Sequence, residues 1–331
     1  MSRGWTGVLF ALVLMSMALP VPAGGGDLAP IRALLAVPEP RLDLLQAKLT
    51  IDGLIEPSAD ADATRRQIEV LTNRIALRFP SGADDRTKLE LLVGSLAQPG
   101  PWNDGRAFAY DLNDPFGKNV RNKVLSTYLA TRRGNCVSMP ILLVILGQRL
   151  GLDMTLATAP EHVLVKFREK GGAWINIEAT SFGTKTDDRY RDEMAISTKA
   201  LANGLYLRPL NRRETVAVMM GTLMEFYGQR RQPQRRIEVA DLLLRSNPKD
   251  LSAILTKAAA YRQLMALRYI ERYPDPADIP VASRQDFLDL QAKNHAWFDR
   301  AEALGWVLPS PSQDANYRKL IRQTKVARGG G

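Results

Sequence analysis

The sequence predicts an α+β protein that is mostly helical, with a small antiparallel sheet packed on a buried central helix. Three observations support this fold class: apolar residues recur at helical spacing through most of the chain, one helical segment at 136–150 has an apolar centre on every side, and two short segments at 162–167 and 174–180 alternate with period two. A C-terminal region of helical hairpins or repeats completes the architecture. With 331 residues, 45% of them hydrophobic, the chain is long enough to bury such a core.

The first 23 residues have the layout of a secretory signal peptide. Arg3 supplies a positive charge, Val8–Leu19 form an apolar run that is short for a spanning helix, and small residues follow up to Ala23. We expect cleavage after Ala23 and a periplasmic or secreted protein. An uncleaved anchor is the alternative, and only that form would associate with a membrane. Residues 24–40, rich in Gly and Pro, are predicted to be a linker.

Four amphipathic helices are expected before the central one. They cover residues 41–55, 62–79, 84–96 and 122–134. Asp84 or Asp85 is the predicted N-cap of the third, because a short acidic side chain accepts hydrogen bonds from the first free backbone N–H groups. Residues 108–119 are dense in turn formers and are predicted to be a loop, which precedes the central helix closely enough in sequence to border its start.

The central helix is predicted from about residue 136 to Leu150, with Gly151 as its C-terminal cap. Residues 141–146 are apolar on every side, which is typical of a helix buried in the core. The strand segments that follow are separated by Lys170-Gly171-Gly172, so an antiparallel hairpin is the natural interpretation.

The remainder, from about residue 211, is predicted to be helical and distinct from a first domain at 41–210. Tyr227 and Tyr261 are 34 residues apart, and Asn247-Pro248 fits the exit turn of a tetratricopeptide-like unit, whose period is 34. A generic helical hairpin is the alternative. The second of the two histidines, His295, lies in an ordinary amphipathic pattern and is interpreted as structural.

The net charge is +10, and residues from 201 onward hold 21 Lys and Arg against 13 Asp and Glu. For an exported protein this favours anionic cell-envelope material over nucleic acid as a partner, although a solvated basic helical surface explains the charge as well. No cofactor is expected. A metal site is also not expected, because two histidines and one cysteine without HxxxH or CxxC spacing are too few for zinc.

The single cysteine, Cys136, is predicted at the start of the central helix. There the free N–H groups and the positive end of the helix dipole favour the nucleophilic thiolate, although a buried structural cysteine is the alternative. His162, at the start of the first strand, is the candidate base. On the second strand Glu178 and Asn176 share one face, and either could orient the imidazole. For His162 and Glu178 to share a face, the hairpin loop must contain an odd number of residues.

The order of Cys136, His162 and an acidic residue on the next strand resembles the transglutaminase-like superfamily, whose core is a papain-like thiol fold. The resemblance runs through GNCVSMPILLVILGQRLGL, PEHVLVKF and WINIEAT, within residues 108–183. It implies a nucleophile at Cys136, a base at His162 and an orienting carboxylate at Glu178. The family's usual residue at the last position is Asp, so Glu178 is a departure, and Asn176 remains the papain-like alternative.

The resemblance implies a cysteine hydrolase or acyltransferase that acts on amide bonds of a peptide or protein substrate through a thioester. The alternative is a catalytically inactive transglutaminase-like scaffold, whose helical C-terminal region binds a peptide or protein partner.

Overall fold

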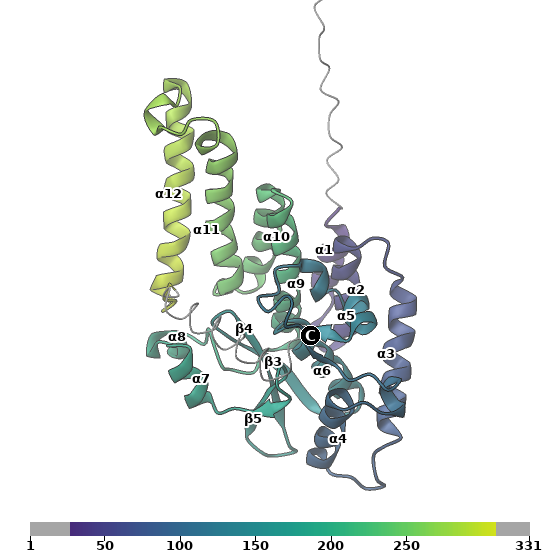
Figure 1. Ribbon diagram of the computed structural model, residues 1–331. Coiled ribbons are helices and arrows are strands. Elements are labelled where there is room, and N and C mark those ends of the chain that lie inside the picture. Colours follow the sequence, from purple (N-terminus) through teal and green to yellow (C-terminus); the bar gives the residue numbers. More distant parts are fainter. Residues whose placement is uncertain (1–26, 309–331) are drawn as a thin grey trace, which may run out of the picture.

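A computed structural model describes residues 27–308, and within this range the protein is α+β, as predicted (Figure 1). The predicted signal peptide lies outside the described residues. Within residues 27–308 no helix has both the length and the apolar character needed to cross a membrane. The helices are α1 (Ala29–Ala36), α2 (Leu44–Ile55), α3 (Ala61–Ala76), α4 (Asp85–Ala97), α5 (Leu125–Thr131), α6 (Ser138–Arg149), α7 (Asp187–Glu193), α8 (Thr198–Ala202), α9 (Arg212–Gln229), α10 (Pro233–Ser246), α11 (Leu251–Met265) and α12 (Val281–Ala303).

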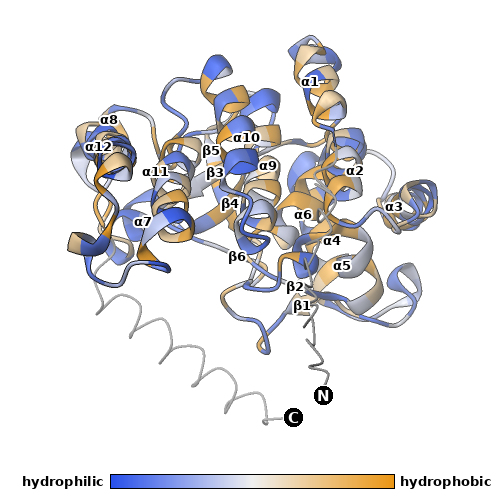
Figure 2. Cartoon of the chain, turned by 90° about the horizontal axis from the view of Figure 1, so that it is seen from above, coloured by the Kyte–Doolittle hydropathy of each residue, from blue (hydrophilic) through white to orange (hydrophobic). Residues whose placement is uncertain are grey.

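Helix α6 is the buried central helix that the sequence predicts. Residues 138–147 are all buried, and Figure 2 shows α6 among apolar residues in the middle of the molecule. Each fully buried Leu or Ile side chain contributes about 1.5–3 kcal/mol relative to an exposed one. The helix ends as expected, since Gly151 has a φ of 80° and its N–H donates to the carbonyl of Gln148.

A four-stranded antiparallel sheet packs against α6. Its order is β3 (Asp153–Ala159), β4 (His162–Arg168), β5 (Trp174–Glu178) and β6 (Gly183–Thr184). Gly147 allows β3 to approach closely, because a Cβ at that position would lie 2.1 Å from the sulfur of Met154. The sequence predicted β4 and β5 but not their neighbours. A separate parallel pair joins β1 (Ala109–Tyr110) to β2 (Arg133–Gly134).

The expected linker at 24–40 is instead helical over Ala29–Ala36. Leu28 and Ile31 are fully buried and belong to the same apolar cluster as α2, α6 and α9. Residue composition suggested a linker because Gly and Pro dominate residues 20–30, whereas the apolar residues after Pro30 pack on the core. Pro30 is compatible with this helix because it lies in the first turn, where its missing N–H has no partner to lose.

The C-terminal helices α9 to α12 stand side by side, each packed on the next (Figure 1). Val216, Met219 and Leu223 of α9 lie in the main core, so this helix joins the C-terminal region to the sheet and α2. A separate apolar cluster connects α11 and α12 through Leu264 and Leu290. The assignment of these helices as tetratricopeptide-like stays a prediction.

Candidate functional site

Cys136 lies in the turn that leads into α6. The helical hydrogen-bond pattern already begins here, because the N–H of Met139 donates to the carbonyl of Asn135. The side chain of Asn135 accepts hydrogen bonds from the N–H groups of Val137 and Ser138, at 3.0 and 3.1 Å, and the Ser138 hydroxyl accepts from the Asn135 N–H at 3.0 Å. This reciprocal arrangement is a capping box. Helix α6 itself begins at Ser138, two residues later than the start expected at Cys136, so Cys136 lies in the turn just before the helix with its thiol partly exposed.

The backbone before Cys136 is fixed by close packing. A Cβ at Gly134 would lie 2.5 Å from the ring of Tyr128 and 2.7 Å from Met139, so only glycine fits without displacement of the chain. The carbonyl of Gly134 accepts from the N–H of Asp111 at 2.7 Å. The loop predicted at 108–119 therefore lies against the segment that carries Cys136.

His162 is the first residue of β4 and follows a two-residue turn, Pro160-Glu161, that joins β3 to β4. Glu161 has a φ of 53°, a conformation that costs a non-glycine residue free energy and that turns its carbonyl toward the thiol. The Cys136 sulfur lies 3.9 Å from this carbonyl oxygen. The turn therefore places the start of β4 beside the start of α6.

The register of the hairpin agrees with the expected odd loop. Val165 pairs with Ile177 and Arg168 with Trp174, so the connection consists of the five residues 169–173. His162 and Glu178 consequently lie on the same face. Nε2 of His162 is 2.7 Å from Oε2 of Glu178, and both side chains are nearly buried, with exposed fractions of 13% and 14%.

Three further groups hold the Glu178 carboxylate. Oε1 accepts from the Thr180 N–H at 3.1 Å and from the Thr180 hydroxyl at 2.6 Å, and the Tyr190 hydroxyl donates to Oε2 at 2.6 Å. Tyr190 comes from α7 and is fully buried. The longer Glu side chain is thus anchored at both oxygens.

The charges of this group stabilise one another. Burial lowers the pKa of His162, but hydrogen bonds to Cys136 and Glu178, and the negative charges of both, outweigh burial and raise that pKa to about 9. Burial raises the pKa of Glu178, but its contacts with His162, Thr180 and Tyr190 lower it to about 2. Burial and the adjacent carboxylate raise the pKa of Tyr190, which stays protonated as a donor. The raised pKa of His162 favours an imidazolium beside the Glu178 carboxylate and the Cys136 sulfur at neutral pH.

Asn176 lies elsewhere on the same strand face. Its side-chain nitrogen donates to the Lys185 carbonyl and to Asp187, at 2.8 and 2.7 Å, and Lys166 contacts the same Asp187 at 2.7 Å. The structure therefore brings Cys136, His162 and Glu178 together but directs Asn176 toward the α7 end. His295 is an exposed residue of α12.

The sequence did not reveal Asn135, Thr180 and Tyr190 as parts of this site. Asn135 is the first member of an Asn-x-x-Ser capping pattern, which is a local signal in the sequence. Thr180 lies in the turn directly after β5, two residues beyond Glu178. Tyr190 has no local signal, because it reaches the carboxylate only through the fold. Among residues 27–308, no group of three or more His, Cys, Asp and Glu side chains is arranged as metal ligands.

The family model described as the transglutaminase-like superfamily matches residues 62–221, which include Cys136, His162 and Glu178. The resemblance found in the sequence is thereby confirmed. A comparison with curated proteins gave no match. Among solved structures, the chain is similar to one described as a crystal structure of menin that reveals the binding site for Mixed Lineage Leukemia (MLL) protein. The match has 12% identity and a TM-score of 0.37, over 89% of this chain and 86% of that chain.

Proposed function

We propose that the transglutaminase-like domain of this chain is a cysteine-dependent hydrolase or acyltransferase that acts on amide or ester carbonyls. The observation that carries the proposal is the alignment of three groups: a partly exposed thiol at a capped helix start, an imidazole beside it, and a carboxylate 2.7 Å from the far ring nitrogen. Since Nε2 faces Glu178, Nδ1 is the ring nitrogen left for the sulfur.

In the first step the Cys136 thiolate attacks the carbonyl carbon. The carbon–sulfur bond forms, the bond to the leaving amine or alcohol breaks, and the imidazolium of His162 gives its proton to the leaving group. A pKa of about 9 keeps His162 protonated for this role at neutral pH. Glu178 holds the ring in position and stabilises its positive charge.

In the second step neutral His162 takes a proton from water or from an acceptor amine. The incoming oxygen or nitrogen bonds to the acyl carbon, the carbon–sulfur bond breaks, and the thiolate and imidazolium are restored. Water gives hydrolysis and an amine gives acyl transfer. We place this chemistry outside the cytoplasm on the basis of the signal-peptide pattern in residues 1–23, with a peptide or protein as the amide substrate.

The test is acylation of Cys136 by p-nitrophenyl acetate, followed by mass spectrometry, together with the rate of iodoacetamide alkylation at pH 7. We expect an acetyl thioester on Cys136 and a native alkylation rate that falls about tenfold or more in His162→Gln, because the imidazolium no longer stabilises the thiolate. His295→Gln is the matched control and should react like the wild type, since that side chain is exposed on α12.

A thiol that reacts only after unfolding, or equal rates in the two histidine variants, would contradict the proposal. That result would favour the alternative of an inactive scaffold whose C-terminal helices bind a partner.

A further inference from the structure

A cavity of about 500 Å³ lies between α3, the segment after the 3-10 turn Pro101–Asn103, and the end of α5. None of the residues that form the Cys136 site lines it. Its walls are one face of α3 together with Trp102, Asp104, Arg106, Leu129 and Arg132. The α3 residues in this wall include Arg66, Val70 and Arg74, which recur every four positions and so lie on one helix face.

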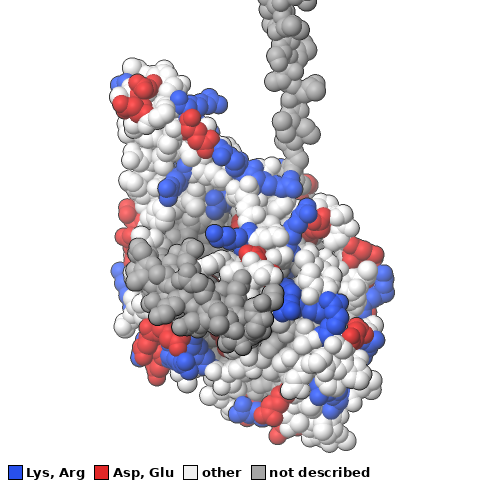
Figure 3. Space-filling model, in the orientation of Figure 1, with Lys and Arg blue, Asp and Glu red and all other residues white. Residues whose placement is uncertain are grey.

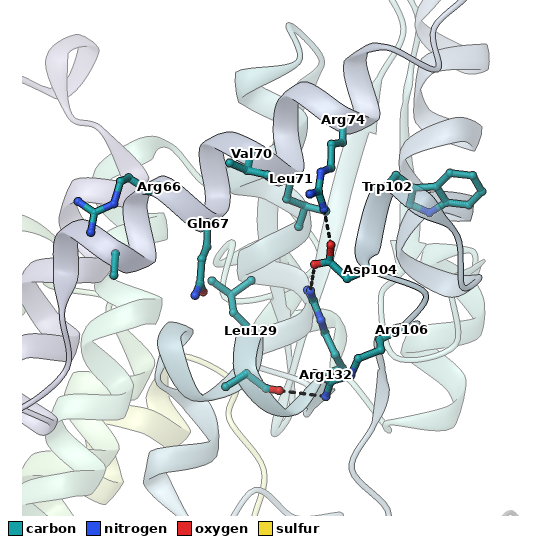
Figure 4. Close-up of a pocket in the computed structure, with 12 residues that line it drawn as sticks. Arg66, Gln67, Val70, Leu71, Arg74, Trp102, Asp104, Arg106, Leu129 and Arg132 are labelled. Atoms are coloured by element: carbon teal, nitrogen blue, oxygen red, sulfur yellow. Dashed lines mark hydrogen bonds and ion pairs between the residues drawn. The ribbon is translucent and has the colours of Figure 1, made fainter.

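The lining is strongly basic. Four arginines face a single carboxylate, which leaves a net charge of +3 on the lining. Figure 4 shows Arg74 and Arg132 approaching Asp104 from two sides, at 2.5 and 3.5 Å. Figure 3 shows Lys and Arg side chains on the face over α5. One carboxylate therefore aligns two guanidinium groups without neutralising the cavity.

Arg132 is the least exposed of these cations, with 14% of its side chain accessible. Its Nε–H is buried and has no acceptor among the described residues, while its guanidinium lies 4.3 Å from the ring centroid of Phe108. Burial, together with the nearby Arg106 and Arg74, lowers the pKa of Arg132. Asp104 raises this pKa but lies 3.5 Å away, and an added anion would supply both an acceptor for the buried Nε–H and further negative charge.

Arg132 and Asp104 each have a φ of 58°, in the left-handed region that favours glycine. The chain therefore accepts backbone strain at both members of the ion pair that lies in the cavity. The rest of the wall includes the apolar side chains of Val70, Leu71 and Leu129. The cavity thus combines cationic groups with a surface that suits an organic moiety, as small-molecule sites do.

We propose that this cavity binds the phosphate group of an organic phosphate. Planar guanidinium groups pair bidentately with phosphate oxygens, and the doubly charged ester matches a net charge of +3 better than a single carboxylate does. The apolar wall accommodates the carbon skeleton next to the phosphate. The ligand is either a soluble phosphate ester or a lipid headgroup, since both present the same anion. The proposal depends on residues separate from the Cys136 site and goes beyond acyl chemistry.

The test is calorimetric titration of the full chain with inorganic phosphate and with glycerol 3-phosphate at low ionic strength. In parallel, the protein is sedimented with phosphatidylcholine vesicles that contain or lack phosphatidic acid. We expect glycerol 3-phosphate to bind more tightly than inorganic phosphate, and binding to weaken as salt is added. Binding of the soluble ester identifies a free metabolite as the source, whereas sedimentation with acidic vesicles alone identifies a lipid headgroup.

Arginine substitutions test whether the phosphate binds in this cavity. The double variant R66Q/R74Q should weaken binding about tenfold or more per arginine, because each charged hydrogen bond is worth roughly that factor. R245Q removes one positive charge from an exposed position on α10, so it is the matched control for R66Q alone, and it should bind like the wild type. If the double variant is unstable, R66Q alone serves, because this side chain is 66% exposed and its pair with Asp60, at 4.0 Å, is solvated.

The proposal is overturned if neither the soluble probes nor the acidic vesicles bind. It is equally overturned if the cavity variants and R245Q lose the same affinity, because binding would then reflect overall charge.

Discussion

Replacement of Glu178 by Gln tests the electrostatics of the Cys136 site through protein stability, without any substrate. Glu178 has a pKa of about 2 in the folded protein against an ordinary value of 4.5, and His162 has a pKa of about 9 against 6.5. The two shifts share the contact between His162 and Glu178, and Cys136 also contributes to that of His162, so they are not added. A shift of this size corresponds to about 3 kcal/mol of folding free energy, at 1.36 kcal/mol per pKa unit. Solvent screening is small because both side chains are nearly buried.

The two pKa shifts stabilise the folded state over different pH ranges. The lowered pKa of Glu178 stabilises the folded state above pH 4.5, and this stabilisation is lost as the pH falls toward 2. The raised pKa of His162 stabilises it below pH 6.5, and this is lost as the pH rises toward 9. The ion pair is therefore fully stabilising only between about pH 4.5 and 6.5.

Urea unfolding of wild type and Glu178→Gln at a series of pH values measures the difference directly. We expect a loss of about 3 kcal/mol at pH 6 that shrinks to about 1 kcal/mol or less above pH 9, where the neutral amide still bonds to Thr180 and Tyr190. Glu169→Gln is the matched control in the same hairpin, and its half-exposed pair with Arg86 should contribute less than about 1 kcal/mol at any pH. A loss in Glu178→Gln that does not vary with pH would refute the ion-pair reasoning.

Two further predictions concern the framework of the site. Gly134→Ala should lower the free energy of unfolding by about 1–3 kcal/mol and slow alkylation of the thiol, because the new Cβ would lie 2.5 Å from the buried ring of Tyr128. The control Gly94→Ala has open space around it in α4 and should be neutral or slightly stabilising in denaturant unfolding. Equal effects of the two substitutions would contradict this prediction. Lys48→Ala should cost about 3–5 kcal/mol in the same assay, because it leaves the buried carboxylate of Asp52 without its cation. Lys88→Ala, which removes a partly exposed lysine from α4, should cost less than about 0.5 kcal/mol. A loss at Lys48 no larger than at Lys88 would mean that Asp52 is protonated.

Much of the fold was predictable because local patterns determine it. The helices at α2, α3, α4 and α9–α12 follow apolar periodicity, and α6 is indicated by its continuous apolar run. Asp84 is the N-cap of α4, as expected. The strand β3 was missed because polar and apolar residues alternate only over its first four positions, and the order breaks at Ala157. Helices α7 and α8 were missed because they have only seven and five residues, which are too few to show a helical repeat of apolar positions.

At the candidate site, too, the sequence predicted the residues with a local signal but not the contacts that depend on the tertiary fold. Cys136 and His162 could be found because a rare residue stands at a recognisable helix start and a histidine begins a strand. The choice between Glu178 and Asn176 could not be made from the sequence, because both lie on one strand face and alternate residues look equivalent. The register resolves the geometry, since it sets Asn176 opposite Lys166 and brings Glu178 to His162.

The glutamate in place of the family's usual aspartate explains why tertiary structure was needed. A longer side chain reaches further and loses more rotamer freedom when it is fixed, so it can orient a histidine only if other groups hold it. Thr180 supplies two donors to one oxygen, and Tyr190 supplies a donor to the oxygen that His162 contacts. Tyr190 belongs to α7, which no local sequence pattern predicted. Glu178, which departs from the family's usual aspartate, is therefore held in place by Tyr190 of α7, a helix that apolar periodicity did not predict.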